Sequence, residues 1–414
     1  YVLANGHTYI VTAGASGGGA AAAAVGGAAN IGVLTKDTQA FIGESAKVYA
    51  RQNIVVSAES TQLLVAVTAS IFGAGAAAVS GDVGTFTFAN TTKAFIDRWA
   101  LVDSEGNVKV SADDDSLLIS VVGVGNGAGV AAVGAVVSVN TIVSKTMAYI
   151  ADGATVNARG NADGIDVYTG ELGDASALSK GAWDDEKWID TDGDGIPDTQ
   201  LVVDKDLDFK RDGISNGSLE DGIDIDLIAE DEDGNADITH NINIPGEGLA
   251  TKQTQKIKGL SVIAVSNQKI ITTTIAVAGA GIAGVTGGNT TNVLDAVTEA
   301  YIADGVNINQ NNGSASSEQM VIVEAFSNAL MVMTEGTIGG AGIAGVSGAV
   351  NVGVISNTTR AHAGGNINAK RDIRVIAWSE EDMHIITANG SGAIIAGVGA
   401  AAAVGVVDGQ TLSY

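Results

Sequence analysis

An alternation of aspartate and glycine between residues 190 and 198 is the part of the sequence best suited to chemistry. The segment reads Asp190-Thr191-Asp192-Gly193-Asp194-Gly195-Ile196-Pro197-Asp198. Aspartates at its first, third and fifth positions place carboxylate oxygens on one side of a tight loop, and glycine permits the turn. The carbonyl oxygen of residue 196 points inward and the last aspartate can close the shell. The spacing therefore predicts a Ca²⁺ site with the ligands Asp190, Asp192, Asp194, Ile196 and Asp198.

The loop differs from an EF-hand, because Leu201 stands at the twelfth position, where a bidentate glutamate is expected. It resembles instead the DxDGDGxxD calcium loops of thrombospondin type 3 repeats and related bacterial surface modules. That resemblance implies that neighbouring acidic residues complete the shells, and the candidates here are Asp204, Asp206, Asp208 and Asp212. A second, weaker cluster spans residues 231–237. Oxygen-only ligands favour Ca²⁺ over zinc or copper, and the alternative is that these acidic loops are only solvated.

The acidic residues lie in what reads as an insertion, from about Asn161 to Lys258. Counted from the sequence, it holds 25 of the 47 acidic and 8 of the 21 basic residues, which is −17 of the net charge of −26. Both prolines, Pro197 and Pro245, also lie in it. We therefore expect three regions: repeats over 1–160, an acidic calcium-binding insertion over 161–258, and further repeats over 259–414.

A repeat becomes visible once the insertion is set aside. The phrase Thr-x-Ala-aromatic-Ile begins at Thr38, Thr92, Thr146 and Thr298, and a divergent copy begins at Thr359. By subtraction the intervals are 54, 54, 152 and 61 residues, so one interval is longer by about 98 residues. The period alone leaves open whether each unit forms two larger or three smaller rungs.

The repeats predict an all-β fold, an elongated β-solenoid of about 54-residue repeats with an acidic inserted module. Each copy contains a run of small residues and an alternating segment such as Asn53–Ala58, and period-two alternation of β-branched residues is typical of strands. Proline is absent from the repeats, as uninterrupted hydrogen-bond ladders require. The run Ala20–Ala24 could start a helical turn, but frequent glycine disfavours helix. Gly and Ala faces would let two sheets approach closely, in a thin and dry wall.

The uncharged segment Ser116–Asn140 is long enough to span a bilayer as a helix. Its six glycine and asparagine interruptions and its counterparts in every repeat instead favour a pair of strands buried on both faces. We expect no transmembrane segment in this part of the protein. The opening Tyr1-Val2-Leu3-Ala4 reads like the middle of a β-region, so the sequence is expected to be a fragment of something longer.

Composition argues against several classes of function. The strongly negative charge disfavours nucleic acid and anionic lipid and favours cations as partners. Cysteine is absent, which removes disulfides and thiolate chemistry. The histidines His7, His240, His362 and His384 are scattered and are read as surface or turn residues. No catalytic motif was found, so an enzyme is not expected, although β-helical carbohydrate-processing enzymes exist.

The repeats also resemble those of very long bacterial exoproteins. Gly-Ala-Gly-Ile-Ala-Gly-Val at 279–285 recurs at 340–346, and such runs look like those of filamentous-haemagglutinin-like adhesins and leukotoxin-type filamentous adhesins. The resemblance implies location at the bacterial outer surface, a solenoid stalk, and a role in adhesion or matrix formation. The expected partner is a ligand on a host or neighbouring cell, or a second copy. The alternatives are a self-assembling filament, sheath or matrix subunit, a carbohydrate-processing β-helix and a membrane-active toxin.

Overall fold

The structure, a computed structural model, describes residues 1–172, 223–230, 236–244 and 252–414. The chain divides into two compact units, one made of Tyr1–Val167 and Gln255–Tyr414 and the other of Tyr168–Thr254. The strands β11 (Ile223–Glu230) and β12 (Ala236–Ile244) lie wholly within the second unit and pair antiparallel. The rest of this section concerns the first unit.

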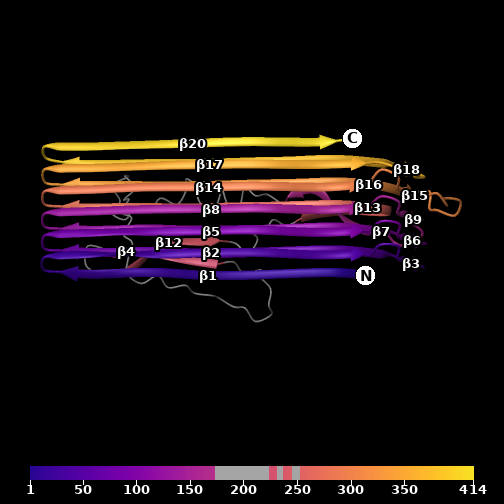
Figure 1. The fold of residues 1–414 in the computed structure, drawn as a ribbon, viewed down its shortest axis with the longest axis horizontal. Coiled ribbons are helices and arrows are strands. Elements are labelled where there is room, and N and C mark those ends of the chain that lie inside the picture. Colours follow the sequence, from indigo (N-terminus) through magenta and orange to yellow (C-terminus); the bar gives the residue numbers. More distant parts are fainter. Residues whose placement is uncertain (173–222, 231–235, 245–251) are drawn as a thin grey trace. The chain divides into compact units, whose positions relative to one another are not determined.

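The first unit is a parallel β-solenoid, as the repeats predict, and its described residues contain no helix. Each coil runs along one wide sheet, returns along a second and crosses a short third sheet (Figure 1). Sheet A contains β1 (Val2–Ala20), β4 (Ile54–Ala74), β7 (Val108–Ala128), β13 (Lys252–Ala280), β16 (Gln319–Ala341) and β19 (Ile373–Ala393), and β10 (Ile165–Leu172) pairs with β13. Sheet B contains β2 (Ala23–Ile42), β5 (Ala77–Ile96), β8 (Ala131–Ile150), β14 (Ala283–Ile302), β17 (Ala344–Ala363) and β20 (Ala396–Ser413). Sheet C contains β3 (Lys47–Ala50), β6 (Leu101–Ser104), β9 (Thr155–Ala158), β15 (Asn307–Ile308) and β18 (Asn366–Ile367).

One repeat forms one coil, so neither two nor three rungs are made from each 54-residue unit. Val2 pairs with Val56, and Val56 pairs with Val110, each 54 residues further along the chain. Across the insertion, Val110 pairs with Val262 in the same register. At about 3.3 Å per residue, strands of some 20 residues make each coil roughly 66 Å wide, whereas neighbouring coils are about 4.8 Å apart.

A two-residue turn joins sheet A to sheet B in every coil, and its first residue is glycine in the four inner coils, at Gly75, Gly129, Gly281 and Gly342. A Cβ on Gly129 would lie 2.1 Å from the carbonyl oxygen of Gly75, and one on Gly281 would lie 2.2 Å from that of Gly129. The turn backbones are therefore stacked in contact. In the last coil the position is Ile394, whose amide donates to Gly342, whereas Gly342 itself donates to Ala280 at the end of the preceding sheet A strand. The turn that contains the larger isoleucine side chain therefore has a different hydrogen-bond pattern from the turns that contain glycine.

The interior is apolar at two levels. A cluster of small and β-branched residues lies beside sheet C and includes Val110, Ala148 and Ile150. A second cluster, near the middle of the wide sheets, includes Phe86, Phe88 and Leu118. Close approach of the two sheets is seen near the turn, where a Cβ on Gly339 of β16 would lie 2.4 Å from the carbonyl oxygen of Val346 in β17. The predicted thin wall is thus present at that end.

Between the two apolar clusters runs a layer of buried polar side chains, which the sequence did not lead us to expect. The Asp114 carboxylate accepts hydrogen bonds from Ser144 at 2.6 Å, Gln268 at 2.8 Å and Thr92 at 3.2 Å. Burial raises the pKa of Asp114, and these hydrogen bonds oppose the rise. Because the donors come from three coils, the layer links successive coils through their side chains. The interior is therefore not dry in the sense of being wholly apolar.

The segment Ser116–Asn140 is the end of β7, the turn and the first half of β8. The expectation that both of its faces are buried was wrong, because the residues of β8 alternate between buried and outward-facing and Val133 and Val137 are each 37% exposed. Among the described residues, no helix is both long and apolar enough to cross a membrane.

Candidate functional site

The predicted calcium ligands lie outside the described residues. Asp190, Asp192, Asp194, Ile196 and Asp198 fall within 173–222, as do Asp204, Asp206, Asp208 and Asp212. In the weaker cluster only Ala236 and Asp237 belong to a described strand, β12. Within the described ranges, no group of three or more histidine or acidic side chains is placed to hold a metal ion. The calcium site stays a prediction.

The outer surface of sheet B forms a broad face of small and β-branched residues. Alternate positions of each strand point outward, and strand pairing aligns them in columns, such as Val79, Val133, Val285, Val346 and Val398. We define the neutral face as the outward residues of Val25–Val33, Val79–Thr87, Val133–Thr141, Val285–Val293, Val346–Val354 and Val398–Val406. None of these residues, all of which are described, is charged.

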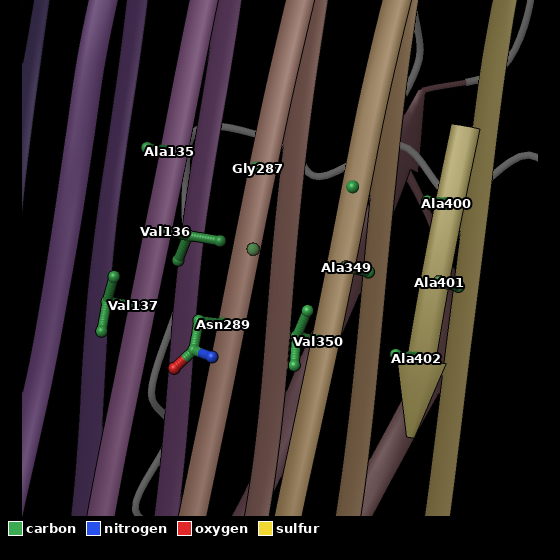
Figure 2. Close-up of a pocket in the computed structure, with 12 residues that line it drawn as sticks. Ala135, Val136, Val137, Gly287, Asn289, Ala349, Val350, Ala400, Ala401 and Ala402 are labelled. Carbon is green, nitrogen blue, oxygen red and sulfur yellow. The ribbon is translucent and has the colours of Figure 1, made fainter. Parts of the chain in front are cut away.

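A shallow apolar trough of about 450 Å³ crosses the neutral face. Figure 2 shows it at the level where the side chains of Val137, Asn289 and Val350 lie on neighbouring strands. Its floor is the column that contains Gly287 and Gly348, in which every residue is Gly or Ala. Since a Cβ on Gly287 would meet nothing within 4 Å, this glycine is not needed for packing within the coil. It leaves room above the sheet.

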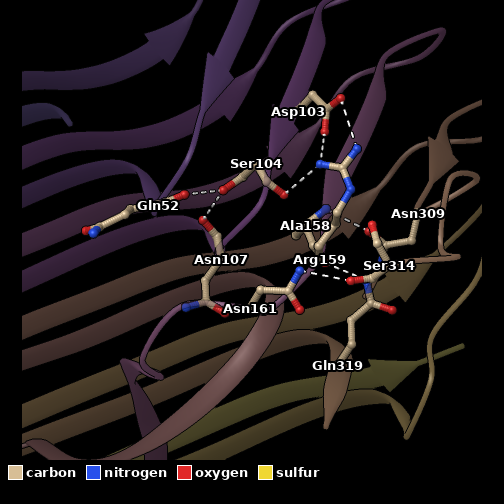
Figure 3. Close-up of polar contacts among 10 residues, drawn as sticks. All are labelled: Gln52, Asp103, Ser104, Asn107, Ala158, Arg159, Asn161, Asn309, Ser314 and Gln319. Atoms are coloured by element: carbon tan, nitrogen blue, oxygen red, sulfur yellow. Dashed lines mark hydrogen bonds and ion pairs between the residues drawn. The ribbon is translucent and has the colours of Figure 1, made fainter. Parts of the chain in front are cut away.

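A second pocket, of about 730 Å³, is polar and lies at sheet C. Its lining includes Tyr49, which is 64% exposed, together with Arg51 and Glu105. Arg159 also lines it, and its guanidinium donates to Asp103 at 2.6 and 3.3 Å (Figure 3).

The loop that follows β15 completes this polar pocket. The Asn161 side chain donates to the carbonyl oxygen of Ser314 at 2.9 Å, and Figure 3 shows these residues beside Arg159. Asn309 begins the loop in a left-handed conformation with φ of 55°. Its side-chain oxygen accepts from the amide of Ala158 at 2.8 Å, which ties the loop to β9. The pocket thus combines both charges, amides and one exposed aromatic ring, which suits a polar ligand.

A continuous aromatic stack runs along the outer surface of sheet B, beyond the neutral face. It is formed in the first five coils by the aromatic residue of the repeated phrase and in the sixth by Tyr414, in the order Phe41, Phe95, Tyr149, Tyr301, His362 and Tyr414. Ring centroids are 4.9–5.1 Å apart and the planes lie within 6° of parallel. Burial raises the pKa of Tyr301 to about 12, and the neighbouring Tyr149 and Glu299 add to the rise.

His362 was read from the sequence as a surface or turn residue, and the structure places it in this stack, on β17. Burial lowers its pKa, against the opposing influence of Asp304 and Glu299. The signal for the stack was the fixed aromatic position in the repeat, which we used to find the period and not to predict contacts.

These features define the described part of the chain as a parallel β-solenoid repeat protein that carries a neutral face and a polar pocket. Comparison of the chain with models of known families, with curated proteins and with solved structures finds no match.

Proposed function

We propose that the chain is a segment of a secreted or surface-anchored structural and adhesive repeat protein, the stalk of a bacterial adhesin at the outer cell surface. The observation that carries the proposal is the unbroken register of six coils, in which each strand of the wide sheets pairs with the corresponding strand of each adjacent coil. Such an array gains length by adding coils, without changing the coil itself. No catalytic role is proposed.

The adhesive part of the proposal is supported by the position of the polar pocket. Its residues come from sheet C and from the loop after β15, on the side of the solenoid where the connections are long. The ligand would be a polar group on a host or neighbouring cell. Tyr49 and Glu105 are the substitutions of choice because both line the pocket.

Calcium is proposed to rigidify the inserted module, with Asp190, Asp192 and Asp194 as central ligands. The support is the sequence pattern of alternating aspartates and glycines. Calorimetric titration of the whole chain with Ca²⁺ tests this. We expect saturable binding that is lost in the triple variant Asp190→Asn, Asp192→Asn, Asp194→Asn. The proposed site would be excluded if the variant bound Ca²⁺ as the parent does, or if neither bound at millimolar concentrations.

Display of the chain on a non-adherent bacterium tests the adhesive role. We expect the displayed chain to increase attachment to host cells or clumping between bacteria, and Tyr49→Ser with Glu105→Ala to reduce it. Thr334→Ser, on the outer surface of sheet A and outside both the polar pocket and the neutral face, serves as the control and should leave attachment unchanged. Attachment no greater than that of the empty display host would remove the adhesive role.

The alternative is a self-assembling extracellular filament, sheath or matrix subunit. The observation that favours it is the neutral face, because monomeric proteins rarely expose apolar patches of more than a few hundred Å². Electron micrographs of the purified chain distinguish the two proposals, since separate particles favour the stalk and regular lattices favour the assembly.

A further inference from the structure

We infer that the neutral face is an interface that mates, face to face, with the neutral face of a second copy of this chain. The inference deepens the self-assembly alternative and rests on it, because it names the surface and the partner through which assembly would occur. It requires neither calcium nor a host ligand.

The size of the neutral face suits a stable interface. Five outward positions on a strand cover about 26 Å, and six strands at about 4.8 Å cover a little under 30 Å, which gives roughly 750 Å². A standard specific interface buries about 800 Å² on each partner. On the interior strands, Val133, Val285 and Val346 are 37%, 39% and 41% exposed, so the face is open to solvent between its end coils.

Charge points to the same surface. A chain with a net charge of −26 repels its own copies wherever acidic residues face each other. The outer surface of sheet A carries Glu59, Asp113 and Glu380, whereas the neutral face carries no charge. It is thus the wide surface on which two copies can meet without opposing charges.

The relief of the face explains why the partner is a second copy. A ridge of valines, with Val285 and Val346 among them, runs beside the trough floored by Gly287 and Gly348. Ridge and trough both repeat at the strand spacing of about 4.8 Å. A ridge that enters this trough must repeat at the same distance to match it along its length. The valine ridge of another copy has that repeat, and two faces related by a twofold axis can each supply a ridge and a trough.

Sedimentation equilibrium of the whole chain, from low to high micromolar concentration, provides the first test. We expect a reversible dimer or larger assembly that strengthens as salt is raised, since screening weakens the repulsion. Gly287→Lys should raise the dissociation constant about a hundred-fold, because a charge would be buried at the interface without a partner. The matched control is Gly336→Lys on the outer surface of sheet A, where a Cβ also meets nothing within 4 Å; it should associate like the parent.

Cross-linking through introduced cysteines provides the second test. Because the chain contains no cysteine, each disulfide must form through an introduced residue. Under mild oxidation, a mixture of the Gly287→Cys chain with the Val285→Cys or Val346→Cys chain should form a disulfide-linked dimer, because the ridge of one copy enters the trough of the other, and Gly336→Cys should not. A chain that is monomeric throughout, or dimers that tolerate Gly287→Lys and cross-link only through Gly336→Cys, would overturn the inference. Attachment in the display assay would then still stand, so failure of the interface is distinguishable from failure of the adhesive role.

Discussion

The ring of Tyr149 stacks on the ring of Tyr301 at a centroid distance of 4.9 Å, although 152 residues separate them in the chain. The spacing equals that between Phe95 and Tyr149, which belong to consecutive repeats. The coil that follows the insertion therefore continues the stack with the same geometry as the coils that precede it.

Removal of the insertion should leave the solenoid folded. We expect a chain in which residues 173–251 are replaced by a short Gly-Ser linker to keep its β-sheet circular dichroism and a melting temperature within a few degrees of the parent, because the entropy of closing a loop depends weakly on its length. Thermal unfolding followed by circular dichroism is the measurement. Loss of the sheet signal would mean that the insertion is needed for folding.

The aromatic stack should contribute measurably to stability. Tyr149 contacts two rings, and stacked pairs contribute about 0.5–1.5 kcal/mol each beyond the area that they bury. Tyr149→Ala should therefore lower the free energy of unfolding by roughly 1–3 kcal/mol or more, measured by urea denaturation. Tyr149→Phe keeps both ring contacts and is the control; equal losses in the two variants would show that the hydroxyl group, and not stacking, is responsible.

Glycine in the two-residue turns should not tolerate even one added methyl group. Gly129→Ala places a Cβ against the carbonyl of Gly75, and we expect a loss of about 2 kcal/mol, in the range seen for overpacked sites. The matched control is Gly127→Ala, two residues earlier, where a Cβ meets nothing within 4 Å. Its stability in urea should equal or slightly exceed that of the parent, and a similar loss in both variants would contradict the steric explanation.

A buried glutamate should make the solenoid more stable in mild acid. Burial raises the pKa of Glu335 to about 7, and hydrogen bonds from Val350 and Thr290 oppose the rise. Because the folded state then binds the proton more tightly than the unfolded state, the free energy of unfolding falls as pH rises from about 4.5 to about 7. For this group the fall amounts to at most about 3 kcal/mol.

Glu335→Gln isolates that contribution, because all other acidic groups are retained. Urea denaturation at a series of pH values should give the variant a shallower decline than the parent between pH 4.5 and 7. Parallel curves would show that Glu335 does not titrate in this range in the folded protein.

The strand content, the period and the continuity of the coils could be predicted from the sequence because each follows from local alternation and from repetition. The order in which one coil passes through the three sheets could not be predicted from the sequence. The pattern of Ser116–Asn140 is compatible with strands buried on one face or on both. The position of β8 in sheet B, with one face toward solvent, decides that only one face is buried. Asp114 illustrates the same limit, because its partners Thr92, Ser144 and Gln268 are brought together by the register of three coils and not by spacing along the chain.

The candidate sites were predictable to different degrees. The calcium site stays a prediction, and it rests on a local motif, the alternation of aspartate and glycine over residues 190–198. The polar pocket joins Tyr49, Glu105 and Ser314 from three coils, so no local pattern marks it. The sequence contains the pattern of the neutral face, a set of uncharged alternate positions in each repeat. Only the structure shows that these positions point outward.

The turn between sheets A and B has two residues in all six coils, whereas the connections from sheet C to sheet A differ in length, as residues 51–53, 105–107 and 309–318 show. A stacked glycine backbone leaves no room for growth on the first side. New loops can therefore be inserted only along the margin that contains sheet C. Loops inserted in successive coils would lie next to one another along that margin. The fold thus dictates where such a protein can diversify, and it holds the opposite margin to turns of two residues.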